Sequence, residues 1–231
     1  MDPVTTDYDS FAEAYAAENE TSLMNAYYTL PAVLDLAGDV DGRRILDVGC
    51  GSGPLFAALR ERGAVVSGCD ASAKMVEVAR RKLGDGADLR VADLGEPLPY
   101  PDGAFDDVVA ALVLHYLEDW AAPLAEIRRV LEPGGRLIMA VNHPILYKMV
   151  HPEGDYFAIA KWTDEYAFGV LTYWHRPLHA MTDAFTAAGF RTAVISEPPF
   201  APEACEHFPD ELAKFPSGAF LGFLFFVLEA G

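Results

Sequence analysis

The segment from Arg44 to Gly53 constrains the fold more than any other part of the chain. It reads RILDVGCGSG, an apolar run with β-branched residues that leads through an acid into three glycines at alternate positions. Such a run predicts a buried parallel strand followed by a tight turn, with a helix beginning near Pro54. Glycine lets the turn approach a ligand closely, and the helix N-terminus offers free N–H groups. The segment therefore predicts a nucleotide-like ligand at this turn.

The spacing of the glycines and the acid in front of them distinguish between possible ligands. Dinucleotide dehydrogenases use G-x-G-x-x-G, in which the helix N-terminus receives a pyrophosphate. Here Gly49, Gly51 and Gly53 follow G-x-G-x-G, and Asp47 stands two residues before the first glycine. A carboxylate at that position repels a pyrophosphate and suits a cation. We therefore expect a positively charged ligand rather than NAD.

This segment resembles motif I of the class I S-adenosylmethionine (SAM)-dependent methyltransferases. The family's Asp-x-Gly-x-Gly-x-Gly is matched by Asp47 and the three glycines. SAM carries a sulfonium, an ammonium and no phosphate, so the resemblance agrees with the electrostatic argument. The expected cofactor is SAM, and the expected product is S-adenosylhomocysteine.

Two further segments carry the same resemblance. The pattern at residues 8–16, YDSFAEAYA, resembles the N-terminal helix that closes over SAM in small-molecule methyltransferases. Residues 131–137, LEPGGRL, match the Leu-x-Pro-Gly-Gly-x-Leu of the family. The likeness spans most of residues 8–142 and points to the UbiE or methyltransferase-11 type.

Acidic residues close three successive predicted strands. Asp47 ends the first, Asp70 the second, and Asp93 follows the third. Ligands bind at the carboxyl ends of parallel strands, and an acid about twenty residues beyond a glycine turn accepts ribose hydroxyls. In the family, an acid followed by an apolar residue, here Asp93-Leu94, binds the adenine. The three acids therefore predict an adenosine site along one edge of the sheet.

The resemblance implies an α/β, Rossmann-like fold with helices on both faces of a seven-stranded sheet. The implied strand order is 3-2-1-4-5-7-6, with the last strand antiparallel. We expect residues 1–231 to form a single domain, with a helical lid over residues 1–40. An aromatic-rich cap insertion over residues 143–175 follows the fifth strand, and a possible two-stranded segment from Trp162 to Trp174 bends at Gly169.

These arguments nominate three sets of site residues. The expected cofactor-binding residues are Tyr15, Asp47, Gly49, Cys50, Gly51, Gly53, Asp70, Ala71, Met75, Asp93, Leu94 and Ala110. The expected substrate-binding residues are the aromatic and basic side chains Tyr8, Tyr28, Tyr147, Trp162, Tyr173 and His175. The candidate catalytic residues are His115, Tyr116 and His143, because they follow the fourth and fifth strands at the ligand edge.

The predicted chemistry is methyl transfer to an oxygen, nitrogen or carbon atom of a small molecule. The protein must hold the acceptor close to the methyl group, and a protonated acceptor also needs a base. No metal is expected, because the fourth strand ends in AALVLH without paired acids. Two alternatives stay open: a cyclisation or isomerisation on the same fold, and a non-catalytic SAM-binding module.

Composition excludes several partners. The formal net charge is −18, from 17 basic and 35 acidic residues, so nucleic acids and anionic membranes are disfavoured. The three cysteines form neither a disulfide framework nor a metal-binding spacing. The polar start predicts no signal peptide, and the longest apolar run is too short to span a bilayer. We expect a cytoplasmic protein, and the sequence leaves its oligomeric state open.

Overall fold

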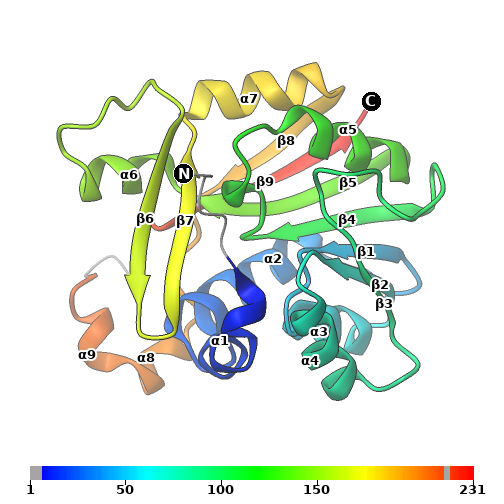
Figure 1. Ribbon diagram of the computed structural model, residues 1–231, viewed down its shortest axis with the longest axis horizontal. Coiled ribbons are helices and arrows are strands. Elements are labelled where there is room, and N and C mark those ends of the chain that lie inside the picture. Colours follow the sequence, from blue (N-terminus) through cyan, green and yellow to red (C-terminus); the bar gives the residue numbers. More distant parts are fainter. Residues whose placement is uncertain (1–6, 216–218) are drawn as a thin grey trace.

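A computed structural model describes residues 7–215 and 219–231 of the chain. It contains a seven-stranded sheet in the order β3-β2-β1-β4-β5-β9-β8, and a separate hairpin of β6 and β7 (Figure 1). The sheet strands are β1 (Arg44–Val48), β2 (Val65–Asp70), β3 (Asp88–Val91), β4 (Phe105–Ala111), β5 (Leu131–Asn142), β8 (Phe190–Ser196) and β9 (Phe223–Ala230). The hairpin strands are β6 (Ala160–Tyr166) and β7 (Gly169–His175).

The strand order confirms the predicted topology. Counted within the sheet, β8 is the sixth strand and β9 the seventh, which gives 3-2-1-4-5-7-6. Strands β1 to β5 are paired in parallel, whereas β9 runs antiparallel to both β5 and β8. The central strands are buried on both faces, which explains why they read as continuous apolar runs.

Helices cover both faces of the sheet (Figure 1). Those before the glycine turn are η1 (Tyr8–Ser10), α1 (Ala12–Asn19), η2 (Asn25–Thr29) and α2 (Leu30–Ala37). The following ones are α3 (Pro54–Glu61), α4 (Ala73–Leu83), η3 (Leu114–Tyr116), α5 (Ala121–Val130), α6 (Pro144–Val150), α7 (Leu178–Ala187), α8 (Ala204–His207) and α9 (Pro209–Leu212). The segment η2 is one turn of π-helix. Among the described residues, no helix is long and apolar enough to cross a membrane.

Two boundaries differ from the sequence prediction. The sequence pattern predicts one short helix around residues 203–214, but two short helices occupy this stretch, and the second begins at Pro209. Proline has no N–H to donate and fits only the first turn of a helix, so the first helix ends before it. The apolar run predicts that the fifth strand covers residues 136–141. Strand β5 begins earlier, at Leu131, because the Pro-Gly-Gly segment is also extended.

The hairpin confirms the predicted two-stranded segment. Trp162 on β6 pairs with Tyr173 on β7, and Gly169 begins the second strand. Trp162, Leu171 and Tyr173 are buried together and pack against side chains of the N-terminal helices and of η3. The hairpin is therefore held over the carboxyl edge of the sheet by aromatic packing.

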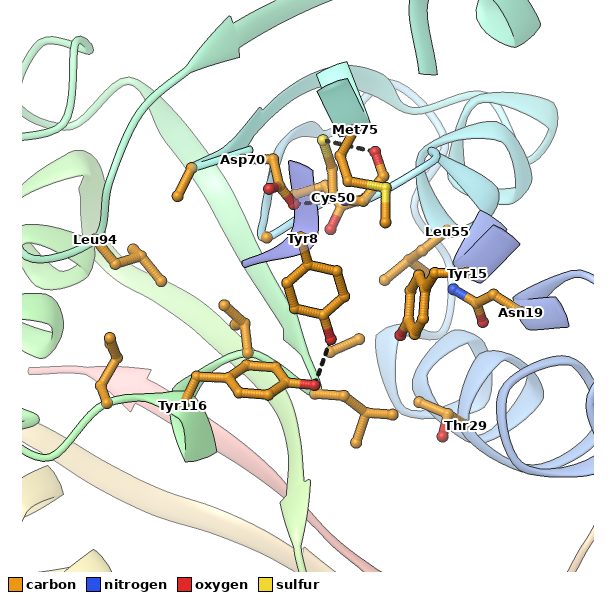
Figure 2. A pocket seen from close by; sticks show the side chains of 18 of the residues that line it. Tyr8, Tyr15, Asn19, Thr29, Cys50, Leu55, Asp70, Met75, Leu94 and Tyr116 are labelled. Carbon is orange, nitrogen blue, oxygen red and sulfur yellow. Dashed lines mark hydrogen bonds between the residues drawn. The ribbon is translucent and has the colours of Figure 1, made fainter. Parts of the chain in front are cut away.

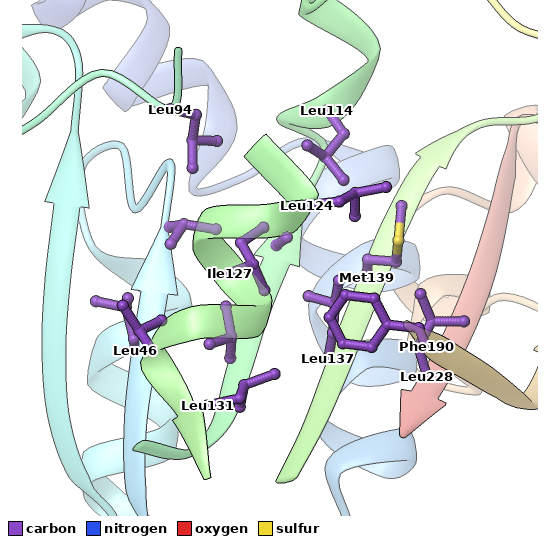
Figure 3. Packing of buried hydrophobic residues seen from close by; sticks show 14 of the residues in the cluster. Leu46, Leu94, Leu114, Leu124, Ile127, Leu131, Leu137, Met139, Phe190 and Leu228 are labelled. Carbon is purple, nitrogen blue, oxygen red and sulfur yellow. The ribbon is translucent and has the colours of Figure 1, made fainter. Parts of the chain in front are cut away.

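The core lies on both sides of the sheet. On one face, Leu124 and Ile127 of α5 point toward Leu46, Leu137 and Met139 (Figure 3). On the other face, α2 and α3 pack on the same strands. These two apolar layers fix the sheet, and with it the positions of the strand ends.

A buried carboxylate ties three strands together at the opposite, amino-terminal side. Asp107 on β4 is fully buried and accepts hydrogen bonds from Arg43 Nε at 2.6 Å and Arg136 Nε at 2.8 Å. Each guanidinium group donates hydrogen bonds from two of its nitrogens to the Asp107 carboxylate. Removing the carboxylate charge would leave two partly buried cations without their partner.

We predict that Asp107→Asn lowers the free energy of unfolding by about 2–3 kcal/mol. The matched change Asp102→Asn should cost under about 1 kcal/mol, because the Asp102 side chain is 82% exposed in its ion pair with Arg129. Urea denaturation of both variants measures the difference. Equal effects of the two variants would contradict a structural role for the buried pair.

Candidate active site

A cavity of about 490 Å³ opens at the carboxyl ends of the central strands. Its walls come from the turn after β1, the ends of β2 and β4, the N-terminal helices and the hairpin. This is the edge at which open parallel sheets bind ligands. Ten of the twelve expected cofactor-binding residues line it: Tyr15, Asp47, Gly49, Cys50, Gly51, Asp70, Ala71, Met75, Asp93 and Leu94.

The glycine turn has a left-handed backbone at all three motif positions. The φ angles are +68° at Gly49, +53° at Gly51 and +86° at Gly53, a region that side chains disfavour. A Cβ on Gly49 would lie 2.6 Å from the Val113 side chain, whereas one on Gly51 would meet no atom within 4 Å. Gly51 therefore leaves open space at the cavity wall. Gly53 packs against Leu83 and does not line the cavity.

Asp70 is held in place by the backbone around it. Its Oδ2 accepts a hydrogen bond from the Gly51 N–H at 2.8 Å, and its Oδ1 accepts one from the Ser72 N–H at 2.8 Å. Burial raises the pKa of this carboxyl, and the two N–H donors oppose the shift. The carboxylate thus connects the end of β2 to the glycine turn and faces the cavity (Figure 2).

Asp47 is the least satisfied acid of the site. The residue is 1% exposed, and its Oδ2 has no hydrogen-bond partner within residues 7–215 and 219–231. Burial, together with repulsion from Asp70, raises the pKa of Asp47 to about 8. A buried carboxyl oxygen without a partner beside a cavity fits a ligand that brings a positive charge or a donor. The residues present therefore fit a cationic cofactor.

Asp93 and its neighbours form the third part of the cavity edge. Asp93 Oδ1 accepts the Gly95 N–H at 2.8 Å, which holds the turn after β3. Ala92 and Leu94 add apolar surface on either side, and the buried Met75 lies across from them on α4. An acid between two apolar side chains suits a flat ring with an amino group at its edge.

Three tyrosine side chains from distant parts of the chain meet in the cavity. The hydroxyls of Tyr8 on η1 and Tyr116 on η3 are 2.5 Å apart, and Tyr15 packs edge-on against Tyr8 (Figure 2). Burial raises the pKa of all three hydroxyls, so they stay neutral near pH 7. They can orient a ligand by hydrogen bonds, but they are poor bases.

The two candidate histidines do not line the cavity. His115 is buried behind Tyr116, and its Nδ1 accepts the Asn142 N–H at 3.0 Å. Burial lowers the pKa of His115 to about 3. His143 caps α6 by accepting the Ile145 N–H at 3.0 Å, and its Nε2 lies 2.8 Å from Glu197. Both positions follow a strand end, as expected, but their rings turn away from the ligand edge.

Most of the expected substrate-binding residues also lie outside the cavity. Tyr8 lines it, whereas Tyr28, Tyr147, Trp162, Tyr173 and His175 do not. Tyr28 is fully buried and donates to the Phe220 carbonyl at 2.9 Å. Tyr147 and His175 stack on each other, with ring centroids 4.2 Å apart. Among the expected cofactor residues, Ala110 is likewise absent from the lining, and the neighbouring Ala111 takes its place.

Several lining residues were missed by sequence reasoning. Asn19, Asn25 and Thr29 come from the N-terminal helices, and Lys161, Thr172 and Trp174 come from the hairpin. Side chains alternate between the two faces of a strand, and the pairing of Trp162 with Tyr173 puts Trp162 and Trp174 on different faces of the hairpin. This alternation was the sequence signal that separates the two tryptophans. Leu112, at the end of β4, also lines the cavity and has a strained φ of 57°. Among the described residues, no group of three or more metal ligands occurs.

Comparisons with known proteins find methyltransferases. A family model described as a methyltransferase domain matches residues 46–139. The ubiquinone/menaquinone biosynthesis C-methyltransferase UbiE of Desulfotalea psychrophila is 32% identical over 175 residues, which cover 68% of this chain and 70% of that protein. The demethylmenaquinone methyltransferase of Thermus thermophilus is 42% identical over 110 residues, which cover 46% of this chain and 50% of that protein. The chain thus spans half to 70% of the length of these curated relatives.

The fold is similar to that of solved structures. The crystal structure of an S-adenosylmethionine-dependent methyltransferase from Mesorhizobium loti has a TM-score of 0.68 and 24% sequence identity. The match covers 91% of this chain and 99% of that one.

We predict that SAM binding is coupled to loss of a proton from Asp47. The pKa of about 8 leaves this carboxyl largely protonated at pH 7, and a cationic ligand favours its ionised form. The dissociation constant of SAM should therefore fall as the pH rises from 6 to 7.5, by roughly twentyfold. Calorimetry in two buffers of different ionisation enthalpy measures the released proton.

The variant Asp47→Asn is the control for this pH dependence. It should bind SAM more weakly at pH 7.5, with an affinity that varies little over the same range. An affinity of the unaltered protein that is constant from pH 6 to 7.5 would exclude Asp47 as the group that titrates.

Proposed function

This chain belongs to the class I SAM-dependent methyltransferases, and on that premise we propose that it methylates a small molecule without a metal. The observation that supports this proposal is the buried Asp47 carboxyl beside the cavity, whose Oδ2 lacks a hydrogen-bond partner in the part of the chain that the structure describes. It lies with Asp70 and Asp93 at the edge where motif I predicted the cofactor. The names of the relatives, which refer to quinone biosynthesis, support a small-molecule acceptor.

The acidic edge and the glycine turn would hold SAM. Asp47 would offset its positive charge, and Asp70, fixed by two N–H donors, would accept its ribose hydroxyls. Asp93, Leu94 and Met75 would enclose the adenine. When bound, SAM supplies a methyl group on a positively charged sulfur.

The part of the cavity away from the acidic edge and the glycine turn would hold the methyl acceptor. Tyr8 and Tyr116 present neutral hydroxyls there, and both residues are partly buried. We propose that the helical lid and the aromatic cap exclude water by closing over the cavity, since side chains of both line it. His115, packed against the Tyr116 ring, would act as a positioning residue rather than as a base.

The net charge of −18 indicates which kind of molecule the protein would act on. An acidic surface repels phosphate backbones and anionic lipids, so we propose a free small molecule as the acceptor rather than a nucleic acid. The methylated atom, whether oxygen, nitrogen or carbon, is left open by this proposal.

Formation of S-adenosylhomocysteine from SAM tests the function. Purified protein is incubated with labelled SAM and a panel of small metabolites, and labelled products are separated by chromatography. Product that carries the label supports methyl transfer. An altered but unlabelled acceptor, without S-adenosylhomocysteine, would favour cyclisation or isomerisation on the same fold instead.

We predict that Asp70→Asn weakens SAM binding by at least tenfold, because the variant loses the charge that the ribose hydroxyls would meet. The matched control is Asp183→Asn on α7, whose side chain is exposed and distant from the cavity lining. Calorimetric titration with SAM measures both variants. Equal SAM affinities of the two variants would show that Asp70 does not bind the cofactor.

We predict that Tyr8→Phe raises the KM for the acceptor by roughly three- to tenfold and leaves the KM for SAM within twofold. The change removes the hydroxyl that contacts Tyr116 and keeps the ring packing. Tyr27→Phe is the control, because the Tyr27 ring packs on Phe208 away from the cavity lining. A rise in the KM for SAM alone would place Tyr8 on the cofactor instead.

A further inference from the structure

Lys161 is the one basic side chain among the described residues that line the cavity. The other charged side chains that line the cavity are all acidic: Asp47, Asp70, Asp93 and Glu118. Within the described part of the chain, no carboxylate forms an ion pair with Lys161. Its ammonium lies 5.9 Å from the centroid of the Trp174 ring. A half-buried cation without a counter-ion favours a ligand that brings a negative charge.

The hairpin register places this lysine in a defined setting. Lys161 on β6 pairs directly with Trp174 on β7, and Thr172 lies two residues before Trp174 on the same face. All three line the cavity. Trp162 and Tyr173 occupy the other face and pack into the aromatic cluster that holds the hairpin. One face of the hairpin therefore packs against the rest of the fold, and the other presents the Trp174 ring and the Lys161 ammonium to the cavity.

Opposite charges in the cavity come from different parts of the fold. The acids that fit the cofactor stand at the ends of β1 and β2 and after β3, whereas the lysine stands on the hairpin. In Figure 1 the hairpin lies on the left, α3 and α4 lie on the right, and α1 lies between them. A cationic cofactor at the acidic edge leaves Lys161 to face the remaining volume.

We propose that Lys161 binds a negatively charged oxygen of the methyl acceptor, either a carboxylate or an ionised acidic phenol, while Trp174 packs against its apolar body. This inference rests on the proposed function and names its substrate class. It also fits the absence of both candidate histidines from the cavity lining, because an acceptor that arrives ionised needs no base. A charge-assisted contact from an ammonium to an oxyanion is about twice as strong as a neutral hydrogen bond.

Matched pairs of small aromatic probes test the proposal. Benzoate is compared with benzamide, and 4-nitrophenolate with 4-nitroanisole at a pH at which the phenol is ionised. Binding to protein saturated with S-adenosylhomocysteine is measured by nuclear magnetic resonance titration. We expect at least one anion to bind roughly tenfold more tightly than its neutral partner. Preference for benzoate indicates a carboxylate acceptor, and preference for nitrophenolate indicates a phenol.

Three variants assign the preference to the lysine. Lys161→Gln should abolish the preference for the anion, and Lys161→Arg should retain most of it. Lys214→Gln makes the same change of net charge at an exposed position outside the cavity lining and should have no effect. Thermal melting of each variant verifies that it is folded.

The outcomes separate this inference from the proposed function. If S-adenosylhomocysteine does not bind to the unaltered protein, the proposed function fails. If it binds but neither anion is preferred, or if the preference survives in Lys161→Gln, only the role of Lys161 fails. Loss of S-adenosylhomocysteine binding in Lys161→Gln would assign the lysine to the carboxylate of the cofactor and also overturn the proposal.

Discussion

The parallel pairing of β1 with β2 and β4 is the constraint on which the site depends. It brings the end of each strand to the same edge of the sheet, and so places Asp47 and Asp70 beside the glycine turn. Burial raises the pKa of both carboxyl groups, and the charge of Asp70 raises that of Asp47 further. Ionisation of Asp47 is therefore unfavourable, and a cationic ligand bound beside it would favour the ionised form.

The cavity is closed by segments that are far apart in the chain. The contact between Tyr8 and Tyr116 joins residues separated by 108 positions. Asp9, next to Tyr8, accepts a hydrogen bond from Ser72 Oγ at 2.5 Å and a second from the Lys74 N–H at 3.1 Å, at the start of α4. The N-terminal segment is therefore attached both to the end of β4 and to the helix that follows Asp70. A ligand bound at this edge would be covered by a segment that polar contacts already position.

The distribution of charge within the cavity differs from that of the whole molecule. The chain as a whole carries a net charge of −18, and the sheet edge follows this trend. The hairpin face carries the opposite charge, because Lys161 lies on it beside Trp174. A buried pocket with acids on one side and a cation on the other can bind two ligands of opposite charge next to each other. The edge of the sheet supplies the acidic side, and the β6–β7 hairpin supplies the basic one.

The sequence by itself determined the glycine turn and the row of acids, because these depend on local patterns: apolar runs, alternate glycines and an acid at each strand end. The strand order was implied only by the resemblance to the class I methyltransferases, because strand pairing joins segments that are distant in sequence. The sequence also predicted the hairpin, since Gly169 interrupts two aromatic segments. Only the tertiary structure decided which way the neighbouring side chains point. His115 and His143 follow strand ends, yet backbone N–H groups hold their rings away from the cavity. Trp174 lines the cavity and Trp162 does not, because Trp162 packs in a cluster with Tyr8 and Tyr116, which are distant in sequence, and this packing decides which face of the hairpin meets the cavity.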